Sequence, residues 1–156
     1  MIVISACLVG EKVRYDGNHK LDLFYKNLID EKKAISICPE ILGGLQVPRE
    51  PAEIIGGDGY DVWNDQAKVM TVTGRDVTIQ FKEGAKRALS IIKDLNAKTV
   101  ILKSDSPSCG STVIYDGTFT GNKKEGVGVT TALFTLNDIN VYDEKTFLTI
   151  FDNHEV

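Results

Sequence analysis

The stretch Ile2-Val3-Ile4-Ser5-Ala6-Cys7-Leu8-Val9-Gly10 opens with a short apolar run that leads into a cysteine. The run is rich in β-branched residues, a pattern that is typical of a strand buried inside a sheet. Similar runs occur at residues 34–38 (Ala-Ile-Ser-Ile-Cys), 98–103 (Lys-Thr-Val-Ile-Leu-Lys) and 139–142 (Ile-Asn-Val-Tyr). We therefore expect four buried strands.

Helical periodicity between these runs predicts the crossovers of a parallel sheet. Apolar residues recur at 3.6-residue spacing, with charged residues on the opposite face. The predicted helices cover residues 19–32 with Asn18 as N-cap, 76–96, a short stretch from 126–130 to about 136, and 144–153. Because strand, helix and strand follow one another at the start of the chain, we expect a right-handed βαβ unit there.

The segment between the second and third predicted strands has a different character. Residues 39–51 contain three prolines and two glycines, which predicts a fixed loop without a regular element. Residues 56–74 are expected to form a hairpin in which Tyr60, Val62 and Trp63 face Val69, Thr71 and Val72 across a turn at 64–66. The predicted fold class is therefore α/β: one domain over residues 1–156, a sandwich with a mostly parallel, Rossmann-like or flavodoxin-like sheet and an inserted β-hairpin.

Composition narrows the classes of function. Hydrophobic residues make up 42% and charged residues 26%, and the net charge is −4. A negative net charge argues against binding to a nucleic-acid backbone, which needs a basic face. The first residues lack a basic leader, and no apolar run approaches the length of a membrane span. We expect a cytoplasmic protein without a membrane partner, whose thiols stay reduced.

Each of the three cysteines of the chain comes at or shortly after the end of a predicted strand. Cys7 follows the first strand, Cys38 ends the second, and Cys109 lies in the loop after the third. Ligands bind outside the carboxyl ends of the strands in open parallel sheets, so neighbouring strands would bring the three thiols into one crevice. Three thiolates suit a soft metal or an iron–sulfur cluster and leave one metal position open. The alternative is that each cysteine packs as a small hydrophobic residue.

Four motifs resemble those of the thiouracil desulfidase family, long described as an uncharacterised bacterial domain. The motifs are residues 5–10 (Ser-Ala-Cys-Leu-Val-Gly) with 13–17 (Val-Arg-Tyr-Asp-Gly), residues 38–40 (Cys-Pro-Glu) with 43–45 (Gly-Gly-Leu) and 48–49 (Pro-Arg), residues 106–110 (Ser-Pro-Ser-Cys-Gly), and residues 126–130 (Gly-Val-Gly-Val-Thr). They occur in the same order over nearly the whole chain. The resemblance implies a [4Fe-4S] cluster held by Cys7, Cys38 and Cys109. It also implies an enzyme that removes sulfur from a small thiolated pyrimidine without redox chemistry and releases hydrosulfide.

Polar residues in these motifs are candidates for the chemistry. Glu40, two residues after Cys38, is a candidate to handle the proton of the attacking water, and Ser106 and Asp16 are further catalytic candidates. Substrate contacts are expected from Arg14, Arg49 and Ser108.

Each candidate also has a purely structural interpretation. Glu40 and Asp16 would be ordinary loop acids, and the serines would form the turn around Pro107. Arg14 and Arg49 would each pair with an acid, such as Glu50 or Glu53. Glycines 126 and 128 would either let a ligand approach a helix N-terminus or allow close packing of that helix.

Two other functions are compatible with the same residues. A non-enzymatic carrier would bind a metal or cluster without acting on a substrate. A cluster-free enzyme would use one nucleophilic cysteine, although neither His19 nor His154 is placed to activate it.

Overall fold

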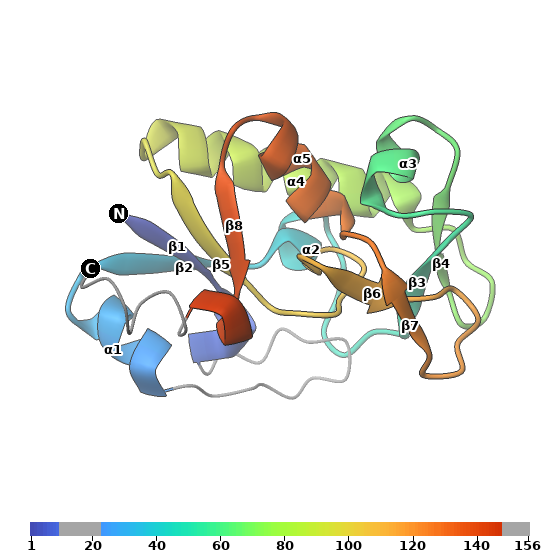
Figure 1. The fold of residues 1–156 in the computed structure, drawn as a ribbon, viewed down its shortest axis with the longest axis horizontal. Coiled ribbons are helices and arrows are strands. Elements are labelled where there is room, and N and C mark those ends of the chain that lie inside the picture. Colours follow the sequence, from blue (N-terminus) through green and yellow to red (C-terminus); the bar gives the residue numbers. More distant parts are fainter. Residues whose placement is uncertain (10–22, 148–156) are drawn as a thin grey trace.

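Four short strands form the central sheet of the protein, whose computed structural model describes residues 1–9 and 23–147 (Figure 1). The strands are β1 (Ile2–Ser5), β2 (Ala34–Ile37), β5 (Thr99–Leu102) and β8 (Asn140–Asp143). They lie in the order β2-β1-β5-β8, and every pairing is parallel. Counted along the chain, this is the 2-1-3-4 order of flavodoxin-like sheets. The expected α/β fold with a parallel sheet is therefore confirmed.

Helices cover both faces of this sheet (Figure 1). The helices α4 (Thr78–Asp94) and α5 (Val129–Leu136) lie on one face, and α1 (Leu23–Asp30) lies on the other. Side chains alternate accordingly, because successive residues of a strand point to opposite faces. Val3, Val100 and Leu102 share a core with residues of α4 and α5. Ile2, Ile4 and Ile101 join a second core with Leu28 of α1.

Two antiparallel hairpins extend the molecule beyond the carboxyl ends of the strands (Figure 1). One pairs β3 (Ala52–Ile55) with β4 (Lys68–Thr71), and the other pairs β6 (Val113–Tyr115) with β7 (Lys123–Glu125). A third apolar core joins the hairpins to α4 and α5; its buried members include Ile54, Val69, Phe81, Ile114 and Val129. The inserted hairpin of the sequence prediction exists, but its strands are β3 and β4.

The predicted strand at residues 60–63 is wrong, because these residues belong to the helix α3 (Gly59–Trp63). Asp58 caps this helix: its side chain accepts hydrogen bonds from the backbone N–H groups of Tyr60 and Asp61. The Asp61 carboxylate accepts the Asp58 N–H in return, at 2.9 Å. This capping box satisfies N–H donors at the start of the helix. It stabilises a short helix where the alternation of apolar and polar residues indicated a strand.

The expectation of a loop without regular structure over residues 39–51 is also partly wrong. Residues Pro39–Leu42 form the short helix α2, with Cys38 as its N-cap. A proline at the first helical position is compatible with a helix, because its missing N–H has no intrahelical partner there in any case. Residues 43–51 are irregular, as expected.

The remaining helix predictions agree with the structure where it describes them. α4 and α5 lie within the predicted ranges, and α1 lies within the range 19–32. Residues 144–147 are helical and begin the expected closing helix. The N-cap at Asn18 and the rest of the closing helix lie outside the described residues.

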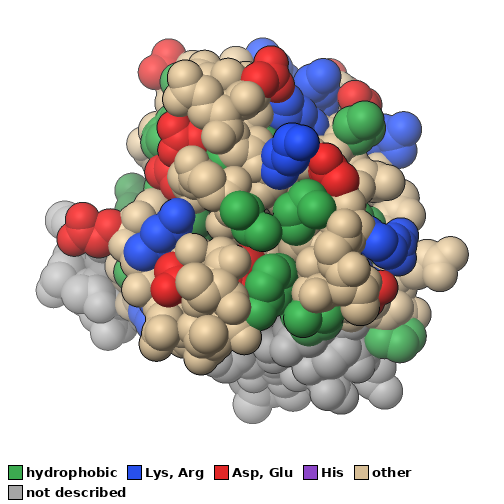
Figure 2. Space-filling view, turned by 90° about the vertical axis from the view of Figure 1, so that its right-hand side faces the viewer, with side chains coloured by type: hydrophobic (Ala, Val, Ile, Leu, Met, Phe, Trp, Pro, Cys, Tyr) green, Lys and Arg blue, Asp and Glu red, His purple; other side chains and the backbone are tan. Residues whose placement is uncertain are grey.

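The hairpin end of the molecule faces the viewer in Figure 2. Positive and negative side chains are interspersed on this face, around a small central group of apolar side chains (Figure 2). None of the helices in the described part of the chain has the length and apolar character needed to cross a membrane.

Candidate functional site

A cleft of about 1140 Å³ lies at the carboxyl ends of the parallel strands, between the sheet and the hairpins. Ser5 of β1, Cys38 after β2 and Lys103 after β5 line it from the parallel sheet. Glu53 of β3 and Phe119 of the β6–β7 loop line it from the two hairpins. The chain reverses its strand order between β1 and β5, and this switch point is where parallel α/β sheets leave a crevice for ligands.

Two cysteine side chains line this cleft. Cys38 is partly exposed at the N-terminus of α2, and Cys109 is buried in the loop after β5, with 5% of its surface accessible. Cys7 lies in the 3-10 helix η1 (Ala6–Val9), directly after β1, and its side chain lies outside the described part of the structure. Because β1 lies between β2 and β5, the three cysteine-bearing segments leave neighbouring strands at the same edge.

Glu40 and Arg49 form an ion pair in the wall of the cleft. The Arg49 Nη2 donates to Glu40 Oε2, and the exposed fractions of the two side chains are 11% and 14%, respectively. The Arg49 Nη1 also donates to the carbonyl of Gln46 at 3.1 Å. The arginine therefore fixes one carboxylate oxygen of Glu40 and holds α2 to the loop that follows it. Its acidic partner is Glu40, and this contact was missed by the sequence reasoning, which named Glu50 or Glu53.

A glycine contact sets the distance between α2 and α4. A Cβ atom on Gly84 of α4 would lie 1.9 Å from the carbonyl oxygen of Pro39. A Cβ atom on Gly43 would lie 2.0 Å from the carbonyl oxygen of Gln80. No side chain fits at either position, so the Cys38–Glu40 segment lies directly against the backbone of α4.

The Cys109 loop has an internal hydrogen-bond network. The Ser106 hydroxyl accepts the N–H of Cys109 at 2.7 Å, and the Ser106 carbonyl accepts the N–H of Gly110 at 2.9 Å. Ser106 lines the cleft. Ser108 is only 1% exposed, and its hydroxyl lies 2.7 Å from the Thr130 hydroxyl. The structure therefore brings Ser106 to the cleft and directs Ser108 into the contact with α5.

The N-terminus of α5 is occupied by this loop. The N–H groups of Gly128, Val129 and Thr130 each donate, at 2.8 Å, to carbonyls of the loop at positions 110, 107 and 108. A Cβ atom on Gly128 would lie 2.4 Å from the carbonyl of Ser108. Close packing is thus the explanation for the glycine at 128, since the donors that a ligand would need are already used.

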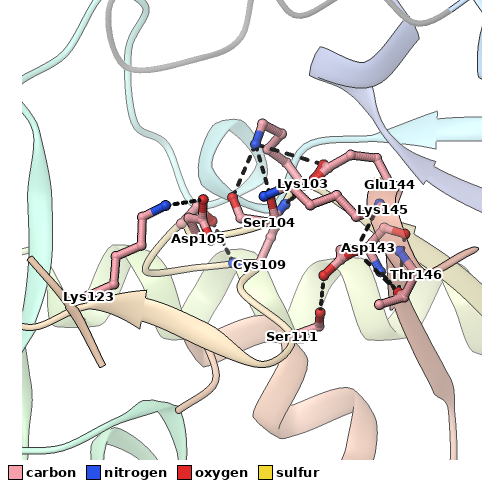
Figure 3. A network of polar contacts seen from close by, with 11 residues as sticks. Lys103, Ser104, Asp105, Cys109, Ser111, Lys123, Asp143, Glu144, Lys145 and Thr146 are labelled. Atoms are coloured by element: carbon pink, nitrogen blue, oxygen red, sulfur yellow. Dashed lines mark hydrogen bonds and ion pairs between the residues drawn. The ribbon is translucent and has the colours of Figure 1, made fainter. Parts of the chain in front are cut away.

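Three charged residues around the loop were missed by the sequence reasoning: Lys103, Asp143 and Glu144 (Figure 3). Lys103 Nζ lies 3.8 Å from Glu144 Oε2, and both side chains are at least 85% buried. In the sequence, Lys103 only ends the apolar run at 98–103, and Asp143 and Glu144 only follow the run at 139–142.

Asp143 is a buried carboxylate with an altered pKa. Burial is the largest single influence and acts to raise this pKa, but hydrogen bonds from Thr146, Ser111 and Lys145 together exceed it and lower the pKa below its ordinary value of 3.8. The residue is therefore charged in the folded protein at neutral pH.

The candidates Arg14 and Asp16 lie outside the described residues. The structure thus brings together Cys38, Cys109, Glu40, Arg49 and Ser106 at one cleft. Thiols, one carboxylate and one hydroxyl at the switch point can hold a soft metal group and exchange protons beside it.

Comparison with known proteins gives a consistent result. A family model described as 2-thiouracil desulfurase matches residues 2–146. The uncharacterized protein YbbK of Bacillus subtilis (strain 168) is 52% identical over 145 residues, which cover 93% of this chain and 96% of YbbK. Among solved structures, the [4Fe-4S]-dependent thiouracil desulfidase TudS has a TM-score of 0.84 and 40% identity, over 95% of this chain and 93% of that one.

Proposed function

The chain belongs to the 2-thiouracil desulfurase family, and on this premise we propose that it is a [4Fe-4S]-dependent enzyme that desulfurates a small thiolated pyrimidine. The observation that carries the proposal is the single cleft at the switch point of the sheet, which Cys38, Cys109 and Glu40 line together. The solved relative, TudS, is a thiouracil desulfidase that depends on such a cluster.

The residues at this edge of the sheet fit the cluster. Sulfur is the donor that iron–sulfur clusters use, and the cleft offers two cysteine side chains from different strand ends. We propose Cys7 as the third ligand, because η1 leaves β1 between them. When bound, a cluster with three protein ligands supplies one iron that is open to the substrate sulfur and acts as a Lewis acid.

The net reaction exchanges sulfur for oxygen without electron transfer. Water adds its oxygen to the carbon that carries sulfur, the carbon–sulfur bond breaks, and sulfur leaves as hydrosulfide. Of the two protons of the attacking water, one leaves on the hydrosulfide and the other is released, so a proton acceptor beside the reacting carbon is required.

Glu40 is our candidate for this acceptor. Its Oε2 is fixed by Arg49, so Oε1 is the oxygen that can face the water. Arg49 therefore acts through Glu40 in this proposal, in addition to the substrate contact that its motif suggests. Ser106 uses its oxygen lone pair to accept the Cys109 N–H, which leaves its hydroxyl proton to donate towards the substrate. Asp16 and Arg14 stay predictions from their motif.

We expect anaerobic reconstitution to give about four irons per chain and hydrosulfide release from 2-thiouracil. Glu40→Gln should keep its iron and lose turnover by about 10²- to 10⁴-fold, the usual contribution of a positioned acid or base. Glu83→Gln, on the exposed face of α4, is the matched control and should retain full activity.

Three measured outcomes separate the alternatives. Full turnover in Glu40→Gln would remove the proton-transfer role from this residue. Iron without hydrosulfide release in the wild-type protein would indicate a carrier. A chain that takes up no iron, and whose Cys→Ser variants behave as the wild type, would refute the cluster.

A further inference from the structure

Two adjacent acidic residues, Asp143 and Glu144, bind opposite ends of the Cys109 loop (Figure 3). The loop leaves β5 after Leu102 and reaches β6 at Val113. Asp143 ends the edge strand β8, which pairs with β5, and Leu102 is the residue opposite it. The carboxylates therefore stand beside the point where the loop begins.

Glu144 binds the entry of the loop. Its two carboxylate oxygens accept the backbone N–H of Ser104, at 3.0 and 3.2 Å. The neighbouring Lys103 lies 3.8 Å from the same carboxylate, and its ammonium group also donates to Ser104. Ser104 is 6% exposed, so this hydrogen bond to a charged group lies away from water, where it is stronger than at the surface.

Asp143 binds the exit of the loop. Its Oδ2 accepts the hydroxyl of Ser111 at 2.9 Å. Its Oδ1 accepts the N–H groups of Lys145 and Thr146, at 2.9 and 2.8 Å, and so caps the helical turn that follows β8. One carboxylate thus joins the loop to a helix start, and its lowered pKa keeps it charged.

The inner side of the loop is held separately by α5. The Thr131 hydroxyl donates to the carbonyl of Cys109 at 2.9 Å, in addition to the backbone contacts of Gly128 to Thr130. These contacts fix the middle of the loop, whereas the two carboxylates fix its ends. A loop that carries a metal ligand needs contacts at its middle and at its ends, because the direction of the ligand side chain depends on the backbone that supports it.

We propose that Asp143 and Glu144 are positioning residues that hold Cys109 in the direction required for a metal ligand. The proposal rests on the proposed function, because it takes Cys109 to be a cluster ligand. It assigns the pair no contact with substrate. Their role is to restrict the loop, so that Cys109 stays buried in the apoprotein and retains iron in the loaded protein.

The variants Ser111→Ala and Glu144→Gln test the two ends of the loop. Ser111→Ala removes the loop's hydrogen bond to Asp143 and leaves the helix cap intact. Thr146→Ala is the matched control, because it removes a side-chain partner of the same carboxylate on the helix side and leaves Ser111 in place. Thermal unfolding of each apoprotein first confirms that the variants are folded.

The first measurement is alkylation of the folded apoprotein with iodoacetamide, followed at each cysteine by mass spectrometry. We expect Cys109 to react about tenfold faster in Ser111→Ala and in Glu144→Gln. Each variant weakens or removes one hydrogen bond to a carboxylate, and a loss of this size makes opening of the loop about tenfold more frequent. Cys38 is partly exposed and lies on another element, so its rate should not change. The second measurement is the rate at which a chelator removes iron from the loaded protein, which should rise by a similar factor in both variants.

The outcomes distinguish this proposal from the proposed function. The positioning role would be overturned if both variants were alkylated and lost iron at the same rates as the wild-type protein. The proposed function would stand in that case, provided that desulfidation was normal. Equal acceleration in Thr146→Ala would also overturn it, because the effect would then come from the helix cap. A wild-type chain without iron would refute the proposed function, and alkylation of Cys109 would still decide whether the carboxylates restrict the loop.

Discussion

The Glu40–Arg49 pair shows how two single residues at the cleft depend on each other. Both side chains are nearly buried, so each charge has lost most of its contact with water. A buried charge without a partner costs several kcal/mol, whereas the intact pair contributes little or nothing relative to apolar residues. The pair is therefore better explained by the orientation of Glu40 than by the stability of the fold.

Arg49→Met should lower the free energy of unfolding of the apoprotein by about 2 kcal/mol, because it leaves the Glu40 carboxylate without its cation. The double variant Arg49→Met with Glu40→Gln should recover part of this loss, since the unpaired charge is then absent. Urea unfolding of the four proteins of this double-mutant cycle measures the coupling. Strictly additive losses would contradict a direct pair.

At the scale of elements, the contact between α2 and α4 determines where the Cys38 motif lies. Glycine in the middle of a helix lowers helix stability relative to alanine by about 1 kcal/mol. Gly84 nevertheless occupies the middle of α4, where a Cβ atom would collide with the carbonyl of Pro39. The close approach of α2 to α4 therefore outweighs the low helix propensity of glycine at this position.

Gly84→Ala should therefore destabilise the apoprotein by about 1–3 kcal/mol, the cost of overpacking in a close contact, despite the better helix propensity of alanine. It should also reduce the iron that the protein takes up, because α2 must move and Cys38 is the N-cap of α2. Ser90→Ala, on the exposed face of the same helix, should be neutral or slightly stabilising. Iron analysis and urea unfolding of both variants check this; unchanged iron content in Gly84→Ala would show that α2 does not set the ligand position.

The elements themselves show which sequence signals were sufficient. Apolar β-branched runs predicted all four parallel strands, because a strand buried on both faces has little freedom in composition. The helix α3 was missed because Tyr60, Val62 and Trp63 also suit an alternating strand. Asp58 and Asp61, three residues apart, instead indicate the start of a helix, and the capping box that they form stabilises α3.

At the scale of the whole molecule, the site is assembled from segments that meet only in the folded chain. β1 leads to Cys7 in η1, β2 leads to Cys38, and β5 leads to the Cys109 loop. A group that binds all three stabilises the native state and not the unfolded chain, which lacks the arrangement.

Removal of the cluster by anaerobic chelation should lower the thermal unfolding temperature by at least about 3 °C, which corresponds to roughly 1 kcal/mol for a domain of this size. The effect should be reversible on reconstitution. Cys109→Ser, treated identically, should show a smaller difference because one of the proposed ligands is absent. Calorimetry of loaded and stripped protein is the measurement, and identical unfolding temperatures would count against ligation by all three segments.

The candidate site was predictable to the extent that its residues lie at strand ends. The cysteines, Glu40 and Ser106 all follow a buried run closely, so the topology of a parallel sheet places them at one edge. Arg49 was identified as a candidate, but its partner depends on the path of an irregular loop. Asp143 and Glu144 are distant in sequence from every cysteine, and only the pairing of β8 with β5 brings them to the Cys109 loop.

The pairing of β1 with β5 also constrains when the protein can acquire its cluster in the cell. β1 is among the first segments to leave the ribosome, but its neighbour on one side begins at Thr99, opposite Ile2. The pairing of segments so distant in sequence is slow and follows local structure. A nascent chain that has not yet reached β5 offers two of the three cysteines and no closed cleft. We therefore expect delivery of a cluster to the proposed three-cysteine site to follow synthesis of the Cys109 loop. In the folded apoprotein, Cys109 is 5% exposed, so its thiol is protected from solvent until the cluster arrives.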